Sequence, residues 1–352
     1  MGVRVREAGR AIGRRPVLLA GVAAAAGVLL PSRRVRAAEA PPLLRISTEN
    51  AAEHIQTRIV ARFAERLAER AEGRIAVRHS FGAQSFRDRD VFRAMDQGRL
   101  EMAVPGTWQL DRVDPSVGVL GLPAFYGHEA SVHNAVRDGP LGREINRRLE
   151  VASRGTILGR WIDLGFINLY GVNRVITTHA DLKGLRIRVA GGEANLHRLT
   201  AMGAQPRVIP WSDLPEALAE GQVDGLCTSH ETVVSRQMWG QGVCSGIEDR
   251  QYFAQYIPLV AGRFWDALPP PLRDLAVITW EDQVEWARAE AAAAQQAARH
   301  RLLANDVVIV APPQEVLAAE RARLMTIQPA VVAAMRIDPE LVKTAMAALG
   351  QG

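Results

Sequence analysis

The chain has 352 residues and a formal net charge of +5 at pH 7, which is too long for one ordinary core and about right for two lobes. The first 40 residues hold eight arginines and two glutamates, a net charge of +6, so residues 41–352 carry −1. The basic balance therefore belongs to the N-terminal segment, and the rest of the chain has no charge surplus that would favour a nucleic-acid or anionic-membrane surface.

The N-terminal segment has the pattern of an export signal. Arg14 and Arg15 precede an apolar run at 17–30, and small residues follow around Ala38. A run of this length is too short to span a bilayer and fits the central region of a signal peptide. We predict that residues 1–37 are a cleaved twin-arginine signal peptide, with an ordinary signal peptide as the alternative, and that the mature chain is periplasmic.

The mature chain opens with a βαβαβ pattern. Ile55, Ile59, Phe63 and Leu67 recur at four-residue spacing, which predicts a helix. The predicted elements are strand 43–47, helix 51–72, strand 74–80, helix 87–97 and strand 100–106. Glycines at 73 and 98 are well placed to end the two helices.

The same pattern recurs in the second half of the chain. The predicted elements are strand 185–190, helix 193–202, strand 206–211, helix 212–220 with Ser212 as its N-cap, and strand 223–229. The repeated βαβαβ pattern predicts two similar α/β lobes with mainly parallel sheets.

The remaining segments connect the lobes. A helix is predicted at 135–153, two strands at 156–173 cross to the second lobe, and residues 255–273 cross back. A long helix is predicted at about 270–304. The expected fold is a two-lobed periplasmic-binding-protein fold (type II-like) with a ligand cleft between the lobes. The first lobe is assigned to 38–165 plus about 254–285, and the second to 166–253 plus about 286–352.

The sequence lacks the motifs of common catalytic sites. His128 and His133 are five residues apart, whereas a zincin helix needs histidines four apart. No GxSxG or P-loop motif is present, and no cofactor motif is found. A metal that bridges ligand and protein stays open, although no clear carboxylate set is present. Cys227 and Cys244 either form a disulfide or stay free, and an enzyme that uses Cys227 is an alternative function.

Five stretches together resemble the DctP-type solute-binding proteins of tripartite ATP-independent periplasmic (TRAP) transporters. They are FGAQSFRDRDVFRAMDQGRLEMAV, GLPAFYGHEAS, WIDLGFINLYGVNRVITTHADLKG, DLKGLRIRVAGG and MGAQPRVIPWSDLPEALAEGQVDG. The match extends over about residues 43–270 in the family's order. The resemblance implies a protein that is not an enzyme. It would capture a small organic anion, usually a carboxylate, and deliver it to the permease subunits in the membrane, where an ion gradient drives uptake.

The resemblance implies that Arg188 holds the ligand carboxylate. A guanidinium group offers a planar fork of donors that matches a carboxylate and stays charged. Arg188 also lies late in its predicted strand, where the cleft is expected. Arg186, two residues earlier, is expected to pair with an acid or face solvent.

Departures from the family pattern suggest a less cationic pocket. Asn168 stands where many members have another arginine, and Leu226, Cys227 and Thr228 replace Gln, Glu and Asn. Thr228 would still offer a hydroxyl group to a ligand. We therefore expect a monocarboxylate, or an acid with an apolar or hydroxylated tail, rather than a dicarboxylate.

Further ligand contacts are expected at strand ends and near the hinge, and a purely structural role is the alternative for Trp211, Thr107, Trp108 and His54. They are Trp211, Thr107, Trp108, Gln84, His54 and Phe166. Trp161 is expected in the core. A sensory binding protein that docks to a signalling receptor is the alternative within the same fold. A monomer is the default, with the long C-terminal helix as a possible dimer surface.

Overall fold

The computed structural model describes residues 40–350, so the predicted signal peptide lies outside the described residues. The strands in this range are β1 (Leu43–Ser47), β2 (Ala76–Ser80), β3 (Met102–Ala103), β4 (Gly155–Ile157), β5 (Ile162–Val172), β6 (Arg186–Val189), β7 (Gln205–Val208), β8 (Gly225–Thr228), β9 (Val243–Tyr256), β10 (Leu259–Ala261) and β11 (Val308–Val310). The α-helices are α1 (Ile55–Ala71), α2 (Val91–Asp96), α3 (Ala130–Asp138), α4 (Pro140–Ser153), α5 (Glu193–Ala201), α6 (Leu214–Ala219), α7 (His230–Ser235), α8 (Gly262–Ala267), α9 (Pro270–Leu303), α10 (Gln314–Met325), α11 (Gln328–Met335) and α12 (Pro339–Ala348).

The strands form two sheets, one in each lobe. The first sheet has the order β2-β1-β3-β10-β4, and the second has the order β11-β9-β5-β8-β6-β7. The two βαβαβ segments give parallel pairs, as predicted. The strands β10 and β5, which belong to the crossing segments, join their neighbours antiparallel. The predicted two-lobed α/β fold is confirmed, and both sheets are mixed.

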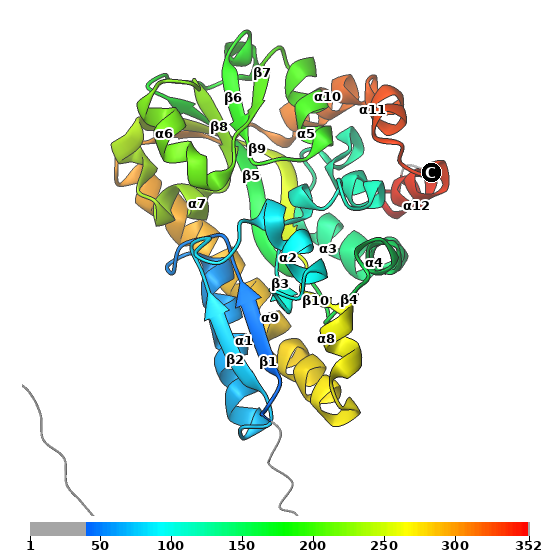
Figure 1. The fold of residues 1–352 in the computed structure, drawn as a ribbon. Coiled ribbons are helices and arrows are strands. Elements are labelled where there is room, and N and C mark those ends of the chain that lie inside the picture. Colours follow the sequence, from blue (N-terminus) through cyan, green and yellow to red (C-terminus); the bar gives the residue numbers. More distant parts are fainter. Residues whose placement is uncertain (1–39, 351–352) are drawn as a thin grey trace, which may run out of the picture. The chain divides into compact units, whose positions relative to one another are not determined.

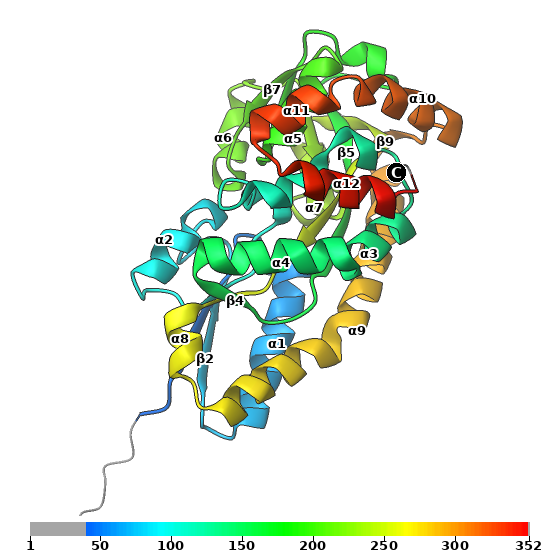
Figure 2. The same ribbon diagram turned by 90° about the vertical axis from the view of Figure 1, so that its right-hand side faces the viewer.

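Two long strands and one long helix connect the lobes. The chain enters the second sheet through β5 and returns through β9, and the two strands pair antiparallel from Ile162–Tyr256 to Val172–Val243 (Figure 1). Helix α9 contacts α1 in the first lobe and α7 in the second, and Figure 2 shows it passing beside α1. The predicted long helix at 270–304 is confirmed.

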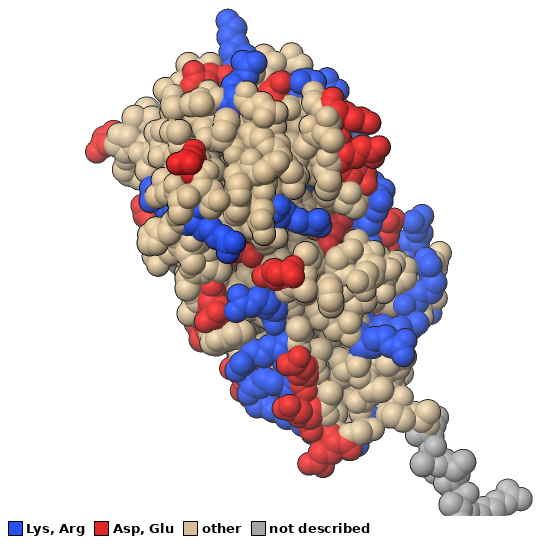
Figure 3. Space-filling model, turned by 90° about the vertical axis from the view of Figure 1, so that its left-hand side faces the viewer, with Lys and Arg blue, Asp and Glu red and all other residues tan. Residues whose placement is uncertain are grey.

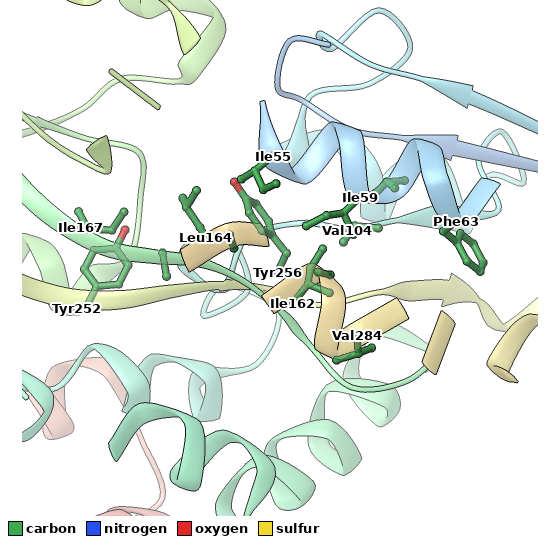
Figure 4. Close-up of a cluster of buried hydrophobic side chains, with 14 of the residues drawn as sticks. Ile55, Ile59, Phe63, Val104, Ile162, Leu164, Ile167, Tyr252, Tyr256 and Val284 are labelled. Carbon is green, nitrogen blue, oxygen red and sulfur yellow. The ribbon is translucent and has the colours of Figure 1, made fainter. Parts of the chain in front are cut away.

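Helix α1 shows how the apolar pattern produces the packing. Ile55, Ile59, Phe63 and Leu67 have no exposed surface, because a four-residue spacing places them on one face of a helix. Figure 4 shows that the first three lie in the cluster that also contains Val284 of α9. The expectation that Trp161 is a core residue is also confirmed, since its exposed fraction is 2%.

Some element boundaries differ from the predictions. The predicted helix 135–153 is two helices, because Pro140 has no N–H to continue the hydrogen bonds of α3 and instead begins α4 after Gly139. The predicted N-cap at Ser212 is wrong. Ser212 lies inside a 3₁₀ turn, Trp211–Asp213, and its hydroxyl donates to the Asp213 side chain. Helix α6 begins only after this turn.

The described surface has no strongly one-signed character. Figure 3 shows acidic and basic side chains interspersed over the face that it displays, in line with the small net charge of residues 41–352. Among residues 40–350, no helix is both long and apolar enough to cross a membrane.

Candidate functional site

A small cavity lies between the lobes, and we call it the inter-lobe cavity. Its lining residues are Glu49, Asn50, Asp88, Trp108, Leu164, Ile167, Arg188, Ala190, Trp211, Cys227, Thr228, Thr232, Tyr252 and Tyr256. They come from both lobes and from the crossing strands β5 and β9. Several follow the carboxyl ends of parallel strands, where ligands bind in open α/β sheets.

The inter-lobe cavity is small. Its volume is about 40 Å³, which holds only a few water molecules. Figure 4 shows part of its wall, with Tyr252 beside Ile167 and Tyr256 beside Leu164 and Ile55. A ligand larger than a few atoms therefore needs the lobes to separate before it enters.

Contacts between the lobes hold the cleft shut. The Gln109 side chain donates to the Ala190 carbonyl at 2.9 Å, and Asp111 accepts from the Glu193 amide at 2.7 Å. Arg87 and Asp213 form an ion pair across the cleft at 3.2 Å. All three contacts involve polar groups near the solvent, which can exchange for water when the lobes open.

Arg188 is the buried cation of this cavity. Only 2% of its surface is exposed, and its Nε donates to the Ile209 carbonyl at 2.9 Å. Its Nη2 is buried and has no hydrogen-bond partner within residues 40–350. Burial lowers the pKa of the guanidinium to about 10, so the group stays charged at neutral pH. A buried charged donor without an acceptor is costly, and an anion in the cavity would remove that cost.

Trp211 adds a second unsatisfied donor. The Arg188 guanidinium carbon lies 5.6 Å from the centre of the Trp211 ring, which is cation–π geometry. The indole Nε1 of Trp211 is buried and has no partner in the described part of the chain. Both residues line the inter-lobe cavity.

Arg186 has the different environment that the sequence suggested. Its Nε and Nη2 donate to the two oxygens of Asp224 at 2.9 and 2.8 Å. This hydrogen bonding from Arg186 is the largest cause that lowers the pKa of Asp224, to about 2. Arg186 is thus neutralised near the surface, whereas Arg188 is buried in the cavity without a carboxylate partner.

Two acids in the wall of the cavity were missed by the sequence analysis. Burial raises the pKa of the Asp88 carboxyl well above its usual range, and the charge of Glu49 raises it further. Burial also raises the pKa of Glu49, while the charge of Arg188 opposes that shift. Glu49 and Asn50 lie two and three residues after the end of β1, so the strand-end rule that selected Thr107 could have found them.

The expected ligand contacts divide into two groups. Thr228, Trp211 and Trp108 line the inter-lobe cavity together with Arg188. Thr107 is buried beside Trp108 in an adjoining cavity of about 30 Å³. The Trp108 ring also packs edge-on against Tyr256 at 5.4 Å. Tyr252 and Tyr256 gave no motif signal, because their place in the wall depends on how β9 crosses between the lobes.

Asn168, Phe166 and Gln84 lie elsewhere. Gln84 is exposed in the loop after β2. Asn168 and Phe166 line a larger cavity of about 510 Å³, which we call the α9 cavity because Arg288, Gln295 and Arg299 of α9 also line it. Asn168 accepts a hydrogen bond from the Arg250 amide at 3.2 Å. The structure therefore does not bring these three expected contacts together with Arg188.

His54 caps a helix and joins the lobes. Its Nδ1 accepts from the Gln56 amide at 3.1 Å, which makes it the N-cap of α1. Its Nε2 lies 3.0 Å from Glu231 of α7, and the same carboxylate accepts from the Ile55 amide at 3.0 Å. His54 is next to the cavity wall through Thr232, at 3.3 Å, but it is not one of the lining residues.

The thiol chemistry considered above has no support in the structure. Cys227 and Cys244 are both free, so the disulfide alternative is wrong for this structure. Burial raises the pKa of the Cys227 thiol to about 12, and a protonated thiol is a poor nucleophile. Within residues 40–350, no group of three or more His, Cys, Asp or Glu side chains is placed to hold a metal ion.

Two α/β lobes joined by crossing strands, with a buried cation in the closed cleft, define a periplasmic-type ligand-binding protein. The sequence model of the DctP family, described as bacterial extracellular solute-binding protein family 7, matches residues 46–332. The chain belongs to this family. The resemblance to DctP-type TRAP solute-binding proteins is thereby confirmed, and the family is one of binding proteins rather than enzymes.

Individual relatives are distant. The C4-dicarboxylate-binding periplasmic protein DctP of Rhodobacter capsulatus is 26% identical over 60% of this chain and 63% of its own length. The first curated relatives are matched over only 50% to 63% of their own length. The sugar acid binding protein DctPAm of Advenella mimigardefordensis, solved with galactonate, superposes with a TM-score of 0.82 at 20% identity, covering 88% of this chain and 98% of that one. A TRAP periplasmic solute-binding protein of Ralstonia eutropha, solved with (S)-2-acetolactate, gives 0.80 at 22% identity, covering 88% and 99%.

Proposed function

We propose that this protein captures a small organic acid with a single carboxylate between its lobes in the periplasm and delivers it to the membrane permease of a TRAP transporter. The observation that carries the proposal is the buried Nη2 of Arg188, which has no partner within residues 40–350. A carboxylate supplies the acceptor and the opposite charge that this group lacks. Relatives whose names state a ligand agree with an organic acid, since they bind galactonate, acetolactate or succinate.

The charges around Arg188 support one carboxylate rather than two. Arg188 is the only lysine or arginine among the residues that line the inter-lobe cavity, and two acids, Glu49 and Asp88, share the wall with it. A second carboxylate on the ligand would find no further arginine or lysine among the lining residues. It would also be repelled by Glu49, because like charges in a poorly solvated site interact strongly.

A thermal-shift screen tests the proposal. Residues 38–352, which contain every described element, are unfolded and refolded to remove carried-over ligand. They are then screened against mono-, di- and keto-carboxylates, sugar acids and amino acids. A ligand at a hundred times its dissociation constant stabilises the protein by about 2.7 kcal/mol, a shift of several degrees. We expect at least one monocarboxylate to give this shift.

Two outcomes would contradict the proposal at different levels. If no organic acid raises the melting temperature, the protein does not bind this class of ligand. If dicarboxylates stabilise it more than every monocarboxylate, the class is right but the inference of a single carboxylate is wrong. Delivery to a permease is tested separately, by uptake of the ligand into vesicles that contain the permease, with and without the binding protein.

A further inference from the structure

We infer that the ligand carries a hydrogen-bond donor, either a hydroxyl or an ammonium group, in addition to its carboxylate, and that Glu49 together with Asp88 binds this donor. This inference rests on the proposed function and specifies the second half of the ligand. It makes the acid pair of the first lobe a determinant of specificity opposite Arg188 of the second lobe.

The placement of the three charged residues is the first argument. Glu49 lies two residues after the end of β1, and Asp88 begins the 3₁₀ turn Asp88–Asp90, so both belong to the first lobe. Arg188 lies in β6 of the second lobe. All three line the inter-lobe cavity, yet Arg188 forms no ion pair with a carboxylate in the described part of the chain. The cation and the acids thus face one cavity from opposite lobes without neutralising each other by direct contact.

The chemistry of the acid pair is the second argument. Asp88 is buried, with 3% of its surface exposed, and Glu49 is half-buried beside it. An ionised Glu49 carboxylate only accepts hydrogen bonds, whereas the raised pKa of Asp88 favours its protonated form, which keeps one oxygen as an acceptor. A ligand that presented only methyl groups to Glu49 would displace water from the carboxylate without replacing its hydrogen bonds, which is unfavourable. A hydroxyl or ammonium group on the ligand replaces the lost water.

Closure of the lobes connects the two halves of the site. The cavity lies where the lobes meet, so a ligand that satisfies Arg188 on one side and the acid pair on the other joins the lobes through its own polar groups. A ligand without a carboxylate would leave Arg188 unsatisfied, and a ligand without a donor would gain no hydrogen bond from the acids. Such a ligand would stabilise closure less.

Matched ligands test the inference. Binding of butanoate is compared by calorimetry with that of its 2-, 3- and 4-hydroxy and 2-, 3- and 4-amino derivatives, using residues 38–352. Hydrogen bonds to charged groups contribute about 1.5–3 kcal/mol, so the best donor-bearing acid is expected to bind roughly tenfold or more tightly than butanoate. The hydroxy and amino arms show which donor the site prefers.

A variant pair identifies the residue responsible. Glu49→Gln removes the charge with little change in shape, and it is expected to reduce the preference for the donor-bearing acid to about threefold or less. Asp88→Asn is the second variant, in case Glu49→Gln lowers folding stability. Glu65→Gln is the matched control. It makes the same chemical change at a residue that is exposed on α1 and does not line the cavity. The control is expected to leave the preference intact.

The outcomes separate this inference from the proposed function. If the wild-type protein binds butanoate as tightly as every derivative, or if Glu49→Gln and Asp88→Asn both keep the full preference, the acid pair does not select the ligand. The proposed function would survive both results. If none of these acids, and no acid in the screen above, binds the wild-type protein, the proposed function and this inference fail together.

Discussion

The inter-lobe cavity and the α9 cavity differ in how their arginines are balanced. The α9 cavity is larger, about 510 Å³ against about 40 Å³, and three arginines line it. Each of them has an acid: Arg250 pairs with Glu129, Arg288 with Asp138 and Arg299 with Glu248. In the inter-lobe cavity, Arg188 has a buried donor with no partner in the described residues.

The comparison shows that unsatisfied charge identifies the site better than size does. A cavity whose arginines are already paired gains little from an anionic ligand, because binding would only exchange one partner for another. A buried, unpaired guanidinium is unfavourable in the empty protein and becomes favourable when an anion binds. Strain of this kind at functional sites is common, because stability and binding make different demands on the same residue.

Replacing one arginine of each cavity with glutamine gives the largest expected effects, on ligand affinity in one case and on folding stability in the other. Arg188→Gln is expected to weaken monocarboxylate binding by about a hundredfold, or about 3 kcal/mol, with little loss of folding stability. Arg288→Gln is expected to lower folding stability and to leave ligand affinity almost unchanged. It breaks the two hydrogen bonds to Asp138 at 2.9 and 3.0 Å and should lower the free energy of unfolding by about 2 kcal/mol, with affinity changed by less than about threefold. Calorimetry and urea unfolding measure the two quantities.

Two results would contradict this comparison. Loss of affinity in Arg288→Gln, with normal binding by Arg188→Gln, would move the ligand site to the α9 cavity. A large drop in stability for Arg188→Gln would mean that this arginine is already satisfied in the empty protein.

His133, which packs against Phe166 and Phe253 in the wall of the α9 cavity, predicts a pH dependence of stability. His133 stacks on Phe253 at 5.3 Å, and its Nε2 is buried without a partner in residues 40–350. Burial is the main cause that lowers the pKa of His133 to about 3, and the charges of His128, Arg137 and Arg250 add to it. Between pH 6.5 and about 3 the unfolded chain therefore binds the extra proton and the folded protein does not. His133 should thus lower stability as the pH falls through this range.

The expected loss from His133 is about 1.4 kcal/mol per pH unit below 6.5, or about 2–3 kcal/mol between pH 6.5 and 4.5. Replacing His133 with Phe should remove this part of the pH dependence, as measured by urea unfolding at both pH values. Burial also lowers the pKa of His79, to about 4, so the variant should keep a smaller dependence. Equal pH slopes for the wild type and the variant would show that His133 is not buried as a neutral ring.

The smallest expected effect concerns Asn168 and Phe166. Because they line the α9 cavity rather than the inter-lobe cavity, Asn168→Ser and Phe166→Leu are each expected to change ligand affinity by less than about threefold. A tenfold loss in the Asn168→Ser protein would instead support the contact that the family resemblance suggested. In that case the two cavities would communicate when the lobes open.

The sequence predicted most of the fold because its elements are locally determined. The spacing of apolar residues in α1, the glycines that end helices and the run of helix formers in α9 act within a few residues of each other. The predictions of helix boundaries were wrong where one local sequence rule competed with another. Pro140 divided a continuous helical pattern, and the 3₁₀ turn Trp211–Asp213 took the place of a cap at Ser212.

The candidate site was only partly predictable. The stretch DLKGLRIRVAGG was enough to select Arg188 over Arg186 by its position in the strand and by family resemblance. The sequence also determined that residues 41–352 carry almost no net charge, which favours a small ligand over a nucleic acid. These features depend on neighbouring residues and composition, which the sequence displays directly.

The tertiary structure decided which residues share the cavity with Arg188. Glu49, Asp88 and Tyr252 reach it from three separate segments, and no local pattern connects them. The crossing of β5 and β9 places Asn168 in the wall of one cavity and Ile167 in the wall of the other. The physical reason is that burial and charge balance are sums over groups that only the folded chain brings together, so the partner missing from Arg188 can be recognised only in the fold.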